Sequence, residues 1–273
     1  MPSLVGSEMC IRDSSDGELY VGQIKKIKGK YYGFAPEGNK AGSMLTGLCA
    51  LRVDNSGNIT KLWARDMDSD DLDDAMNGEG DFDGFGSDTN DTLYYFGNNE
   101  DSDGAMKTGN VNINLDGSSY TFQFQKTGNA KSGRGMGVTG IDDNKYIYSY
   151  GCRIKADSDD KYQLVSVTND EGTSLNINAA GVKVEKLDPK DLDKQYTNKD
   201  DEVVNYTVLS DDSLRLVNVS GNIQKSKTGA KDGNDCYYYV NKKYVPQLYT
   251  DNKTLKSGKN SEKEVSDWTD LLK

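Results

Sequence analysis

Short apolar runs alternate with polar turns along most of the chain, and glycine marks many of the turns. Residues 53–61 (VDNSGNITK) and 217–225 (VNVSGNIQK) share Ser-Gly-Asn-Ile, with a lysine two places later. FQKTGNAKSG at 124–133 and INAAGVKVEK at 177–186 are looser relatives. A glycine between apolar, β-favouring residues indicates a hairpin, because glycine supplies the positive φ that tight turns need. The pattern predicts an all-β fold of tandem β-hairpins.

Residues 66–92 break this pattern, because aspartate and glycine crowd the stretch. Leu72, Ala75 and Met76 can line one side of a short helix over residues 69–76, which the following Asn-Gly would end. The rest is too charged and glycine-rich to bury much. We therefore expect an acidic loop or insertion with one short helix.

Two further polar stretches lie later in the chain. Residues 188–201 form a second polar connection. At the end of the chain, the spacing of Val265, Trp268 and Leu271 or Leu272 predicts a short amphipathic helix.

The first residues fit no structural element. Residues 3–14 (SLVGSEMCIRDS) have the outline of a signal peptide but lack a basic start and a small-residue cleavage site. Their apolar positions follow neither a period of 2 nor one of 3.6. Residues 4–14 are similar to the conceptual translation of a transposase adaptor used in short-read sequencing. We expect an artefact here, with the natural sequence starting near Ser15.

The predicted organisation has six segments. They are an adaptor-derived artefact (1–14), a first repeat unit (15–65), the acidic loop or short helix (66–92), further repeat units (93–157), degenerate hairpin repeats (158–252) and a polar C-terminal tail (253–273).

Composition narrows the class of protein. Only 34% of the residues are hydrophobic, and tyrosine (17) outnumbers phenylalanine (6) and tryptophan (2), which favours thin, tyrosine-rich seams between short strands. The net charge of −11 disfavours nucleic acid as a partner, because phosphate backbones would be repelled. No apolar run is long enough to span a membrane.

The chain has no histidine, which excludes Ser-His-Asp and Cys-His catalysis and histidine-containing zinc sites. Outside the artefact only Cys49, Cys152 and Cys236 remain, without the paired spacing of a metal site, so at most one disulfide is expected. These absences predict a chain without catalytic activity, cofactor or metal.

Two stretches repeat each other: KYYGFAPEGNKAGSMLTG at 30–47 and LYYFGNNEDSDGAMKTG at 93–109. Each has a tyrosine pair, a polar turn and then Gly-x-Met-x-Thr-Gly. A degenerate third copy is GMGVTG at 135–140, followed by YIYSYG at 146–151. Self-similarity of this kind predicts a repeat architecture.

These repeats resemble the cell-wall-binding repeat family of Gram-positive surface proteins, which is related to choline-binding and glucan-binding repeats. Both copies are similar to the family pattern, which is an aromatic run, a turn and then Gly-x-Met-x-Thr-Gly-Trp. The resemblance implies a secreted, cell-wall-associated bacterial protein whose non-catalytic hairpins stack into a β-solenoid-like array. In the choline-binding branch, aromatic rings of neighbouring hairpins form a cage for a quaternary ammonium ion.

This sequence departs from the family at four positions. Leu48 and Asn110 follow the two Thr-Gly pairs where the family often has tryptophan, and Lys30 and Leu93 precede the tyrosine pairs. A full Trp–Tyr cage cannot be assembled, which leaves recognition of wall glycan by tyrosine stacking.

The resemblance and the repeats together give candidate residues. Candidates for ligand binding are Tyr31, Tyr32, Tyr94, Tyr95, Phe96, Tyr146, Tyr148, Tyr237 and Tyr238. Candidates for repeat packing are Phe34, Met44, Met106 and Met136. Neighbours in a strand point to opposite faces, so one tyrosine of each pair is expected to pack inside.

Two acidic runs, residues 66–71 and 99–104, resemble calcium loops but have Asn77 and Asn110 where the closing glutamate should be. Paired carboxylates such as Asp142-Asp143, Asp159-Asp160 and Asp211-Asp212 are interpreted as solvated turn residues rather than a glycosidase pair.

The sequence therefore predicts a non-catalytic module that binds cell-wall polymer or carbohydrate (peptidoglycan, teichoic acid or glucan) and anchors an upstream domain. The alternative is a structural stalk or adhesive protein-binding repeat region without glycan affinity, which the missing tryptophans and the negative charge favour.

Overall fold

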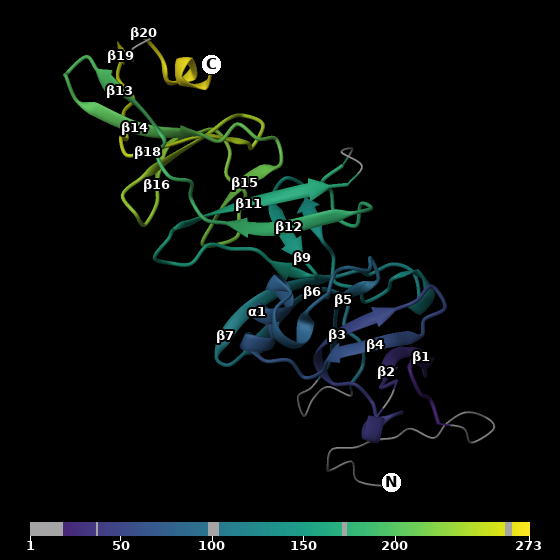
Figure 1. Ribbon diagram of the computed structural model, residues 1–273. Coiled ribbons are helices and arrows are strands. Elements are labelled where there is room, and N and C mark those ends of the chain that lie inside the picture. Colours follow the sequence, from purple (N-terminus) through teal and green to yellow (C-terminus); the bar gives the residue numbers. More distant parts are fainter. Residues whose placement is uncertain (1–18, 37, 98–103, 171–173, 260–263) are drawn as a thin grey trace. The chain divides into compact units, whose positions relative to one another are not determined.

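A computed structural model describes residues 19–36, 38–97, 104–170, 174–259 and 264–273, and β-strands dominate it (Figure 1). The all-β prediction is confirmed at this level. The chain divides into two compact units. Unit 1 contains residues 19–138 and 149–152, and unit 2 contains residues 139–148 and 153–273.

Unit 1 is built from two small antiparallel sheets and a long hairpin. A two-stranded sheet pairs β1 with β2, a three-stranded sheet has the order β4-β3-β5, and β6 pairs with β7. Its elements are β1 (Gln23–Ile27), β2 (Lys30–Phe34), η1 (Gly38–Lys40), β3 (Gly47–Val53), β4 (Ile59–Ala64), α1 (Ser69–Asn77), η2 (Gly80–Phe82), β5 (Asp91–Phe96), β6 (Gly109–Leu115), β7 (Ser118–Phe124) and η3 (Ala130–Ser132).

Unit 2 contains a three-stranded sheet, β12-β11-β15, and a seven-stranded sheet, β16-β17-β18-β14-β13-β19-β20. β8 and β9 form a hairpin. The remaining elements of the chain are β8 (Gly140–Asp142), β9 (Tyr146–Ser149), β10 (Cys152–Arg153), β11 (Tyr162–Asn169), β12 (Val182–Leu187), β13 (Lys194–Asn198), β14 (Val203–Val208), β15 (Leu214–Asn218), β16 (Lys227–Lys231), β17 (Tyr237–Val240), β18 (Pro246–Thr250), β19 (Gly258–Lys259), β20 (Glu264–Val265) and η4 (Trp268–Leu272).

The three predicted copies of the repeat share one backbone geometry. Isolated bridges join Phe34 to Met44, Phe96 to Met106 and Phe124 to Gly137. In each copy, the residue after the bridge donates its N–H to the carbonyl before the phenylalanine, at 2.8 to 3.1 Å. The final glycine of each motif, at positions 47, 109 and 140, has a positive φ. The third copy is therefore a real repeat, although its turn is longer and glycine takes the methionine position.

This geometry corrects the alignment of the tyrosine pairs. Because Phe34 and Phe96 are equivalent, Tyr31 corresponds to Leu93 and Tyr32 to Tyr94. The two tyrosine pairs are thus offset by one residue. What the copies share is an aromatic residue two places before the phenylalanine, which lies on the same strand face.

Successive copies contact each other in a repeated way. The N–H of Met106 donates to the carbonyl of Tyr31 at 2.8 Å, and Gly137 donates to Leu93 at 2.8 Å, which is the equivalent pair one copy later. A Cβ on Gly104 would lie 2.5 Å from Met44 Cε. Met44 therefore fills a gap against the next copy, as expected of a methionine in this position.

The predicted solenoid is nevertheless wrong, because the sheets of the described chain are separate and none is closed or stacked as a solenoid. A solenoid pairs each element with its sequence neighbour. In unit 2, β14 pairs with β18 and β13 with β19, so strands far apart in the sequence lie side by side (Figure 1).

The acidic stretch 66–92 also differs from the prediction. The helix is confirmed as α1, with Asp68 accepting the N–H of Asp71 as N-cap and Gly78 in the left-handed region as C-cap. Yet Phe82 and Phe85, with exposed fractions of 2% and 8%, are buried in the same core cluster as the helix. The expectation that this stretch buries little is wrong, because single phenylalanines enter the core although their neighbours are acidic.

The C-terminal helix is confirmed in part. Trp268–Leu272 forms the 3-10 helix η4 and buries Leu271, whereas Val265 lies in strand β20. Asp267 caps the helix by accepting the N–H of Thr269.

Five hairpin turns use the same three-residue loop. An Asp or Asn side chain accepts the N–H groups two and four residues later, and the residue three places later has a positive φ. The loops begin at Asp54, Asn198, Asn218, Asp232 and Asn241. Two of them are the Ser-Gly-Asn-Ile stretches, whose hairpins are confirmed.

Candidate ligand-binding surface

The structure divides the nine candidate ligand-binding aromatics into two groups. Tyr94, Phe96, Tyr148 and Tyr238 are at most 1% exposed and pack inside the protein. The half-buried rings are Tyr31, Tyr32, Tyr95, Tyr146 and Tyr237. Of the packing candidates, Phe34 is buried and Met44, Met106 and Met136 are half-buried.

The buried rings have a structural role. Tyr94 and Phe96 stack with centroids 6.5 Å apart, and Phe122 and Phe124 stack in the equivalent places of the third copy at 5.7 Å. Burial raises the pKa of the Tyr94 hydroxyl well above its usual value. These rings hold the copies together and offer no surface to a ligand.

Tyr146 is half-buried, but a cation of the protein covers its ring. The Arg153 guanidinium lies 3.9 Å from the ring centroid and donates to the Tyr148 hydroxyl at 3.3 Å. Lys145 lies 4.9 Å from the same centroid. A separation of 3.9 Å is van der Waals contact, so this face of Tyr146 is already occupied.

Trp63, which no sequence pattern selects, is covered as well. The Lys61 amine lies 3.1 Å from its ring centroid, and its indole N–H donates to Asp91 at 3.1 Å. Asp91 also accepts Arg52 Nε at 2.8 Å and Nη2 at 2.9 Å, and the Gly86 N–H at 3.1 Å. This is a structural clamp that joins β3, β4 and β5.

The electrostatics of Asp91 follow from that clamp. Burial raises its pKa, but the hydrogen bonds from Arg52 and Trp63 and the charge of Arg52 outweigh burial, so the pKa lies below its ordinary value. The carboxylate is therefore ionised and fully used within the fold.

Tyr31 differs from Tyr146 and Trp63 in how close the neighbouring cations lie. Its ring packs against the second core cluster of unit 1, as do Met106 and Met136. Lys26 Nζ and Arg134 Cζ each lie over the ring at 5.7 Å from its centroid, farther away than the cations over Trp63 (3.1 Å) and Tyr146 (3.9 Å). All three copies contribute, because Tyr31 belongs to the first, Met106 to the second, and Arg134 and Met136 to the third. We call these five residues the Tyr31 surface.

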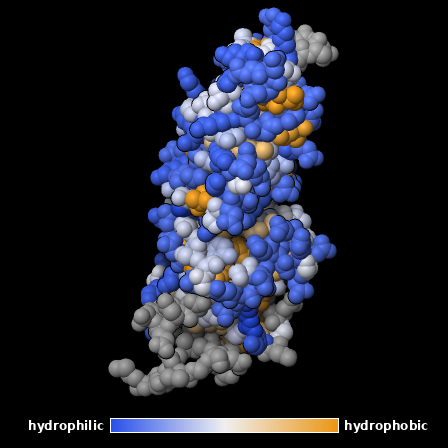
Figure 2. All heavy atoms as spheres, turned by 90° about the vertical axis from the view of Figure 1, so that its left-hand side faces the viewer, coloured by the Kyte–Doolittle hydropathy of each residue, from blue (hydrophilic) through white to orange (hydrophobic). Residues whose placement is uncertain are grey.

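One face of the molecule is mostly hydrophilic, and its hydrophobic residues gather in small patches (Figure 2). Large apolar side chains that remain exposed are few in the described chain, and they are Leu19, Val21, Val203 and Val219.

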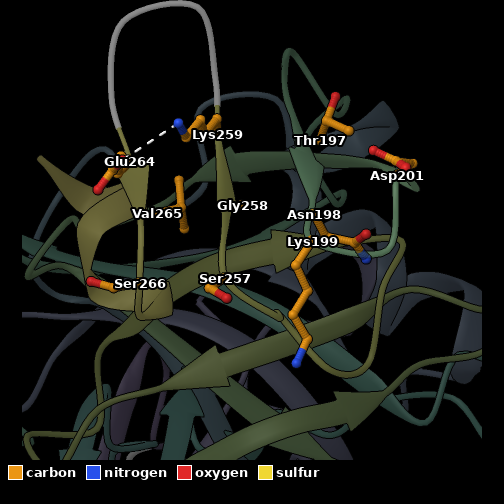
Figure 3. Close-up of a pocket in the computed structure, with 10 residues that line it drawn as sticks. All are labelled: Thr197, Asn198, Lys199, Asp201, Ser257, Gly258, Lys259, Glu264, Val265 and Ser266. Carbon is orange, nitrogen blue, oxygen red and sulfur yellow. Dashed lines mark ion pairs between the residues drawn. The ribbon is translucent and has the colours of Figure 1, made fainter.

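Unit 2 also contains a pocket of about 450 Å³ that no sequence pattern indicates (Figure 3). Two of its lining residues, Lys259 and Glu264, form an ion pair of 3.5 Å. The lining residues are Thr197, Asn198, Lys199, Asp201, Ser257, Gly258, Lys259, Glu264, Val265 and Ser266. None of these described lining residues is aromatic, so they offer no stacking platform for a sugar.

The acidic candidates carry no recognisable chemistry. Asp143, Asp159, Asp160, Asp211 and Asp212 are exposed, and Asp142 is half-buried. Within the described ranges, no group of three or more Cys, Asp or Glu residues is arranged to hold a metal ion. Most of the acidic run 99–104 lies outside the described residues, and in the run 66–71 Asp68 caps α1.

Cys49, Cys152 and Cys236 form no disulfide in the described part of the chain. Burial raises the pKa of Cys49 to about 12. None of the helices in the described ranges has the length and apolar character needed to cross a membrane.

Comparisons with known proteins add little. No family model matches the chain, and no curated protein does. Among solved structures, that of CbpJ from Streptococcus pneumoniae TIGR4 aligns over 94% of this chain and 88% of that chain, with 14% identity and a TM-score of 0.28. A TM-score this low does not indicate a shared fold, so neither fold nor function is inferred from it.

Proposed function

We propose that this chain is a non-catalytic module that binds cell-wall polymer or carbohydrate and belongs to a larger secreted bacterial surface protein. The observation that carries the proposal is the Tyr31 surface, where three repeat copies hold one half-buried ring and two cations lie over it at 5.7 Å from the centroid. The similarity of the repeats to cell-wall-binding repeats supports the same proposal.

A half-buried tyrosine suits this task physically. Its ring is held by packing, so little conformational entropy is lost when a sugar stacks on it. An aromatic contact of this kind contributes about 0.5 to 1.5 kcal/mol. One such site binds weakly, and useful retention on a wall then comes from several sites acting together on a repetitive polymer.

The test is a pull-down of the full chain with purified Gram-positive cell walls, comparing Tyr31→Ala with Tyr146→Ala. Tyr146 is the matched control, because it is also half-buried but its ring is covered by Arg153. We expect Tyr31→Ala to lower the bound fraction about five- to tenfold, which corresponds to roughly 1 to 1.4 kcal/mol, with little change for Tyr146→Ala. Far-UV circular dichroism checks that both variants fold.

Failure of the wild-type chain to pellet with any wall would refute the proposal, and equal losses in the two variants would remove Tyr31 from it.

The alternative, a stalk or adhesive protein-binding region, is favoured by one observation: the rings of Trp63 and Tyr146 are occupied by the protein's own cations. Glycan binding that persists in a chelator-containing buffer would count against the alternative.

A further inference from the structure

The two cations beside Tyr31 bear on the kind of ligand this surface accepts. Lys26 lies directly across from Tyr31 in the β1–β2 pairing, and its amine is 5.7 Å from the ring centroid. Arg134 reaches the same distance from the third copy, and its guanidinium is anchored by donating to the carbonyl of Lys126. That bond uses one of the five guanidinium N–H donors, which leaves others for a ligand.

The ion pairs of the described residues leave both cations out. In the part of the chain that the structure describes, no carboxylate forms an ion pair with Lys26 or Arg134. Lys61 over Trp63 and Arg153 over Tyr146 differ, because they lie in contact with the ring itself. Lys26 and Arg134 lie farther from their ring, at 5.7 Å from the centroid of Tyr31.

The negative charge of the chain is also unevenly placed. Residues 66–92 contain 11 acidic and no basic residues. Residues 19–65 and 93–138, which supply the Tyr31 surface, contain 12 basic and 6 acidic residues. The overall charge of −11 therefore does not describe the repeat copies, which are net basic.

A quaternary ammonium ion is a poor match for this site. Such a ligand is attracted by the negative face of an aromatic ring, but here two positive charges would lie within a few ångströms of it and repel it. An anion beside the ring has the opposite balance, and the planar guanidinium fork suits the two oxygens of a carboxylate or phosphate.

We propose that the Tyr31 surface binds an anionic sugar unit, one that carries a phosphate or a carboxylate. The ring packs against the C–H face of the sugar, and Lys26 and Arg134 contact the anionic group. This inference rests on the proposed function and narrows it to one class of polymer.

The test measures binding of the full chain to three immobilised polymers: phosphorylated dextran, polygalacturonate and neutral dextran. The variants are Lys26→Gln and Arg134→Gln. Lys28→Gln is the matched control, because it removes the same charge from the same hairpin at an exposed position for which no contact with Tyr31 is seen. Melting temperatures confirm that the variants fold.

We expect the wild type to bind at least one anionic polymer and to lose binding as salt is raised. Lys26→Gln and Arg134→Gln should each weaken it about tenfold, and Lys28→Gln at most about twofold. Binding to phosphorylated dextran alone identifies phosphate, and binding to polygalacturonate alone identifies carboxylate.

Three results would overturn the inference while leaving the proposed function intact: equal binding to dextran, competition by choline, or retention on walls that none of the three charge variants alters. Absence of binding to every polymer and to every wall would instead refute the proposed function, and this inference with it.

Discussion

Replacing Asp91 with asparagine tests the clamp that joins the strands of the first sheet. The Asp91 side chain is fully buried and accepts hydrogen bonds from Arg52, Trp63 and Gly86. The asparagine side chain would keep the shape but lose the charge and one acceptor, so the guanidinium of Arg52 would face an amide. Removing one partner of a buried pair costs about 3 to 5 kcal/mol.

Arg52 remains 28% exposed at its side chain, so water can recover part of that loss. We therefore expect a destabilisation of about 2 to 4 kcal/mol. For a unit of roughly 120 residues this corresponds to a fall in melting temperature of about 8 to 15 °C. The matched control is Asp88→Asn, because Asp88 is 38% exposed and lies 3.6 Å from Arg52, so its loss should cost less than about 1 kcal/mol.

Urea unfolding followed by tryptophan fluorescence measures the effect, since Trp63 itself donates to Asp91. A Trp268→Phe background leaves Trp63 as the single reporter, because the sequence has two tryptophans. The experiment also has a pH arm. The pKa of Asp91 is lowered in the folded state, so its stabilisation is present above the unfolded pKa of about 3.9 and disappears as pH falls through the lower folded value.

Asp91→Asn should remove this acid-dependent component. The reasoning would be refuted if Asp91→Asn cost no more than Asp88→Asn, or if the wild type and Asp91→Asn lost the same stability between pH 5 and the acid end of the curve.

Three further substitutions probe other parts of the fold. Phe82→Ala should cost about 3 to 5 kcal/mol in urea unfolding, because the ring is buried in the core; a change below about 0.5 kcal/mol would mean that the acidic stretch is only a surface loop. Gly47→Ala should cost about 2 to 3 kcal/mol, because φ is +70° and the new Cβ would lie 2.9 Å from a backbone Cα. Gly117→Ala is the control and should cost about 1 kcal/mol, because its φ is +85° but the space around it is open. Equal melting temperatures of the two variants would contradict this expectation. Tyr249→Phe should cost about 1.5 to 3 kcal/mol, because it removes the 2.6 Å hydrogen bond to a buried carboxylate, and an unchanged urea midpoint of Trp268 fluorescence would show that the bond contributes nothing.

The local signals in the sequence are reliable where one residue decides the backbone. Gly57 and Gly221 have positive φ and mark two hairpin turns that the sequence predicts. The same loop occurs where the residue with positive φ is Asp201, Asp235 or Tyr244. In these loops no glycine at that position indicates the turn. In those three loops the aspartate or asparagine that starts the turn is the determining residue.

Long-range features cannot be read from local patterns. The pairing of β14 with β18 depends on chain segments about forty residues apart, and alternation within either strand does not identify the partner. The burial of Phe82 cannot be predicted from the local sequence either. Its acidic neighbours lower the average hydrophobicity of the segment, but they do not prevent one ring from entering the core.

The candidate surface is predictable in part. The repeat identifies Tyr31 as a candidate. However, an alignment that matches the tyrosine pairs of the two copies is offset by one residue from the structural alignment, which matches the phenylalanines. Nothing local points to Lys26 or Arg134, since Arg134 lies in a turn of another copy and only folding brings it to the ring. The repeats also point to Tyr94 and Tyr148, which are buried. The alternation of strand faces predicts one buried tyrosine in the pair that contains Tyr94, but it does not say which of the two is buried.

The shared hairpin loop has a consequence for chemical ageing. Asparagine side chains hydrolyse slowly to carboxylates, and this change often disrupts a turn. At Asn218 the loop needs only a side-chain oxygen that accepts two N–H groups, and Asp54 already supplies one as a carboxylate in the equivalent loop. Conversion of Asn218 to aspartate would therefore preserve the turn, whereas at Asn198 it would also remove the amide that donates to Glu202 and set two negative charges against each other.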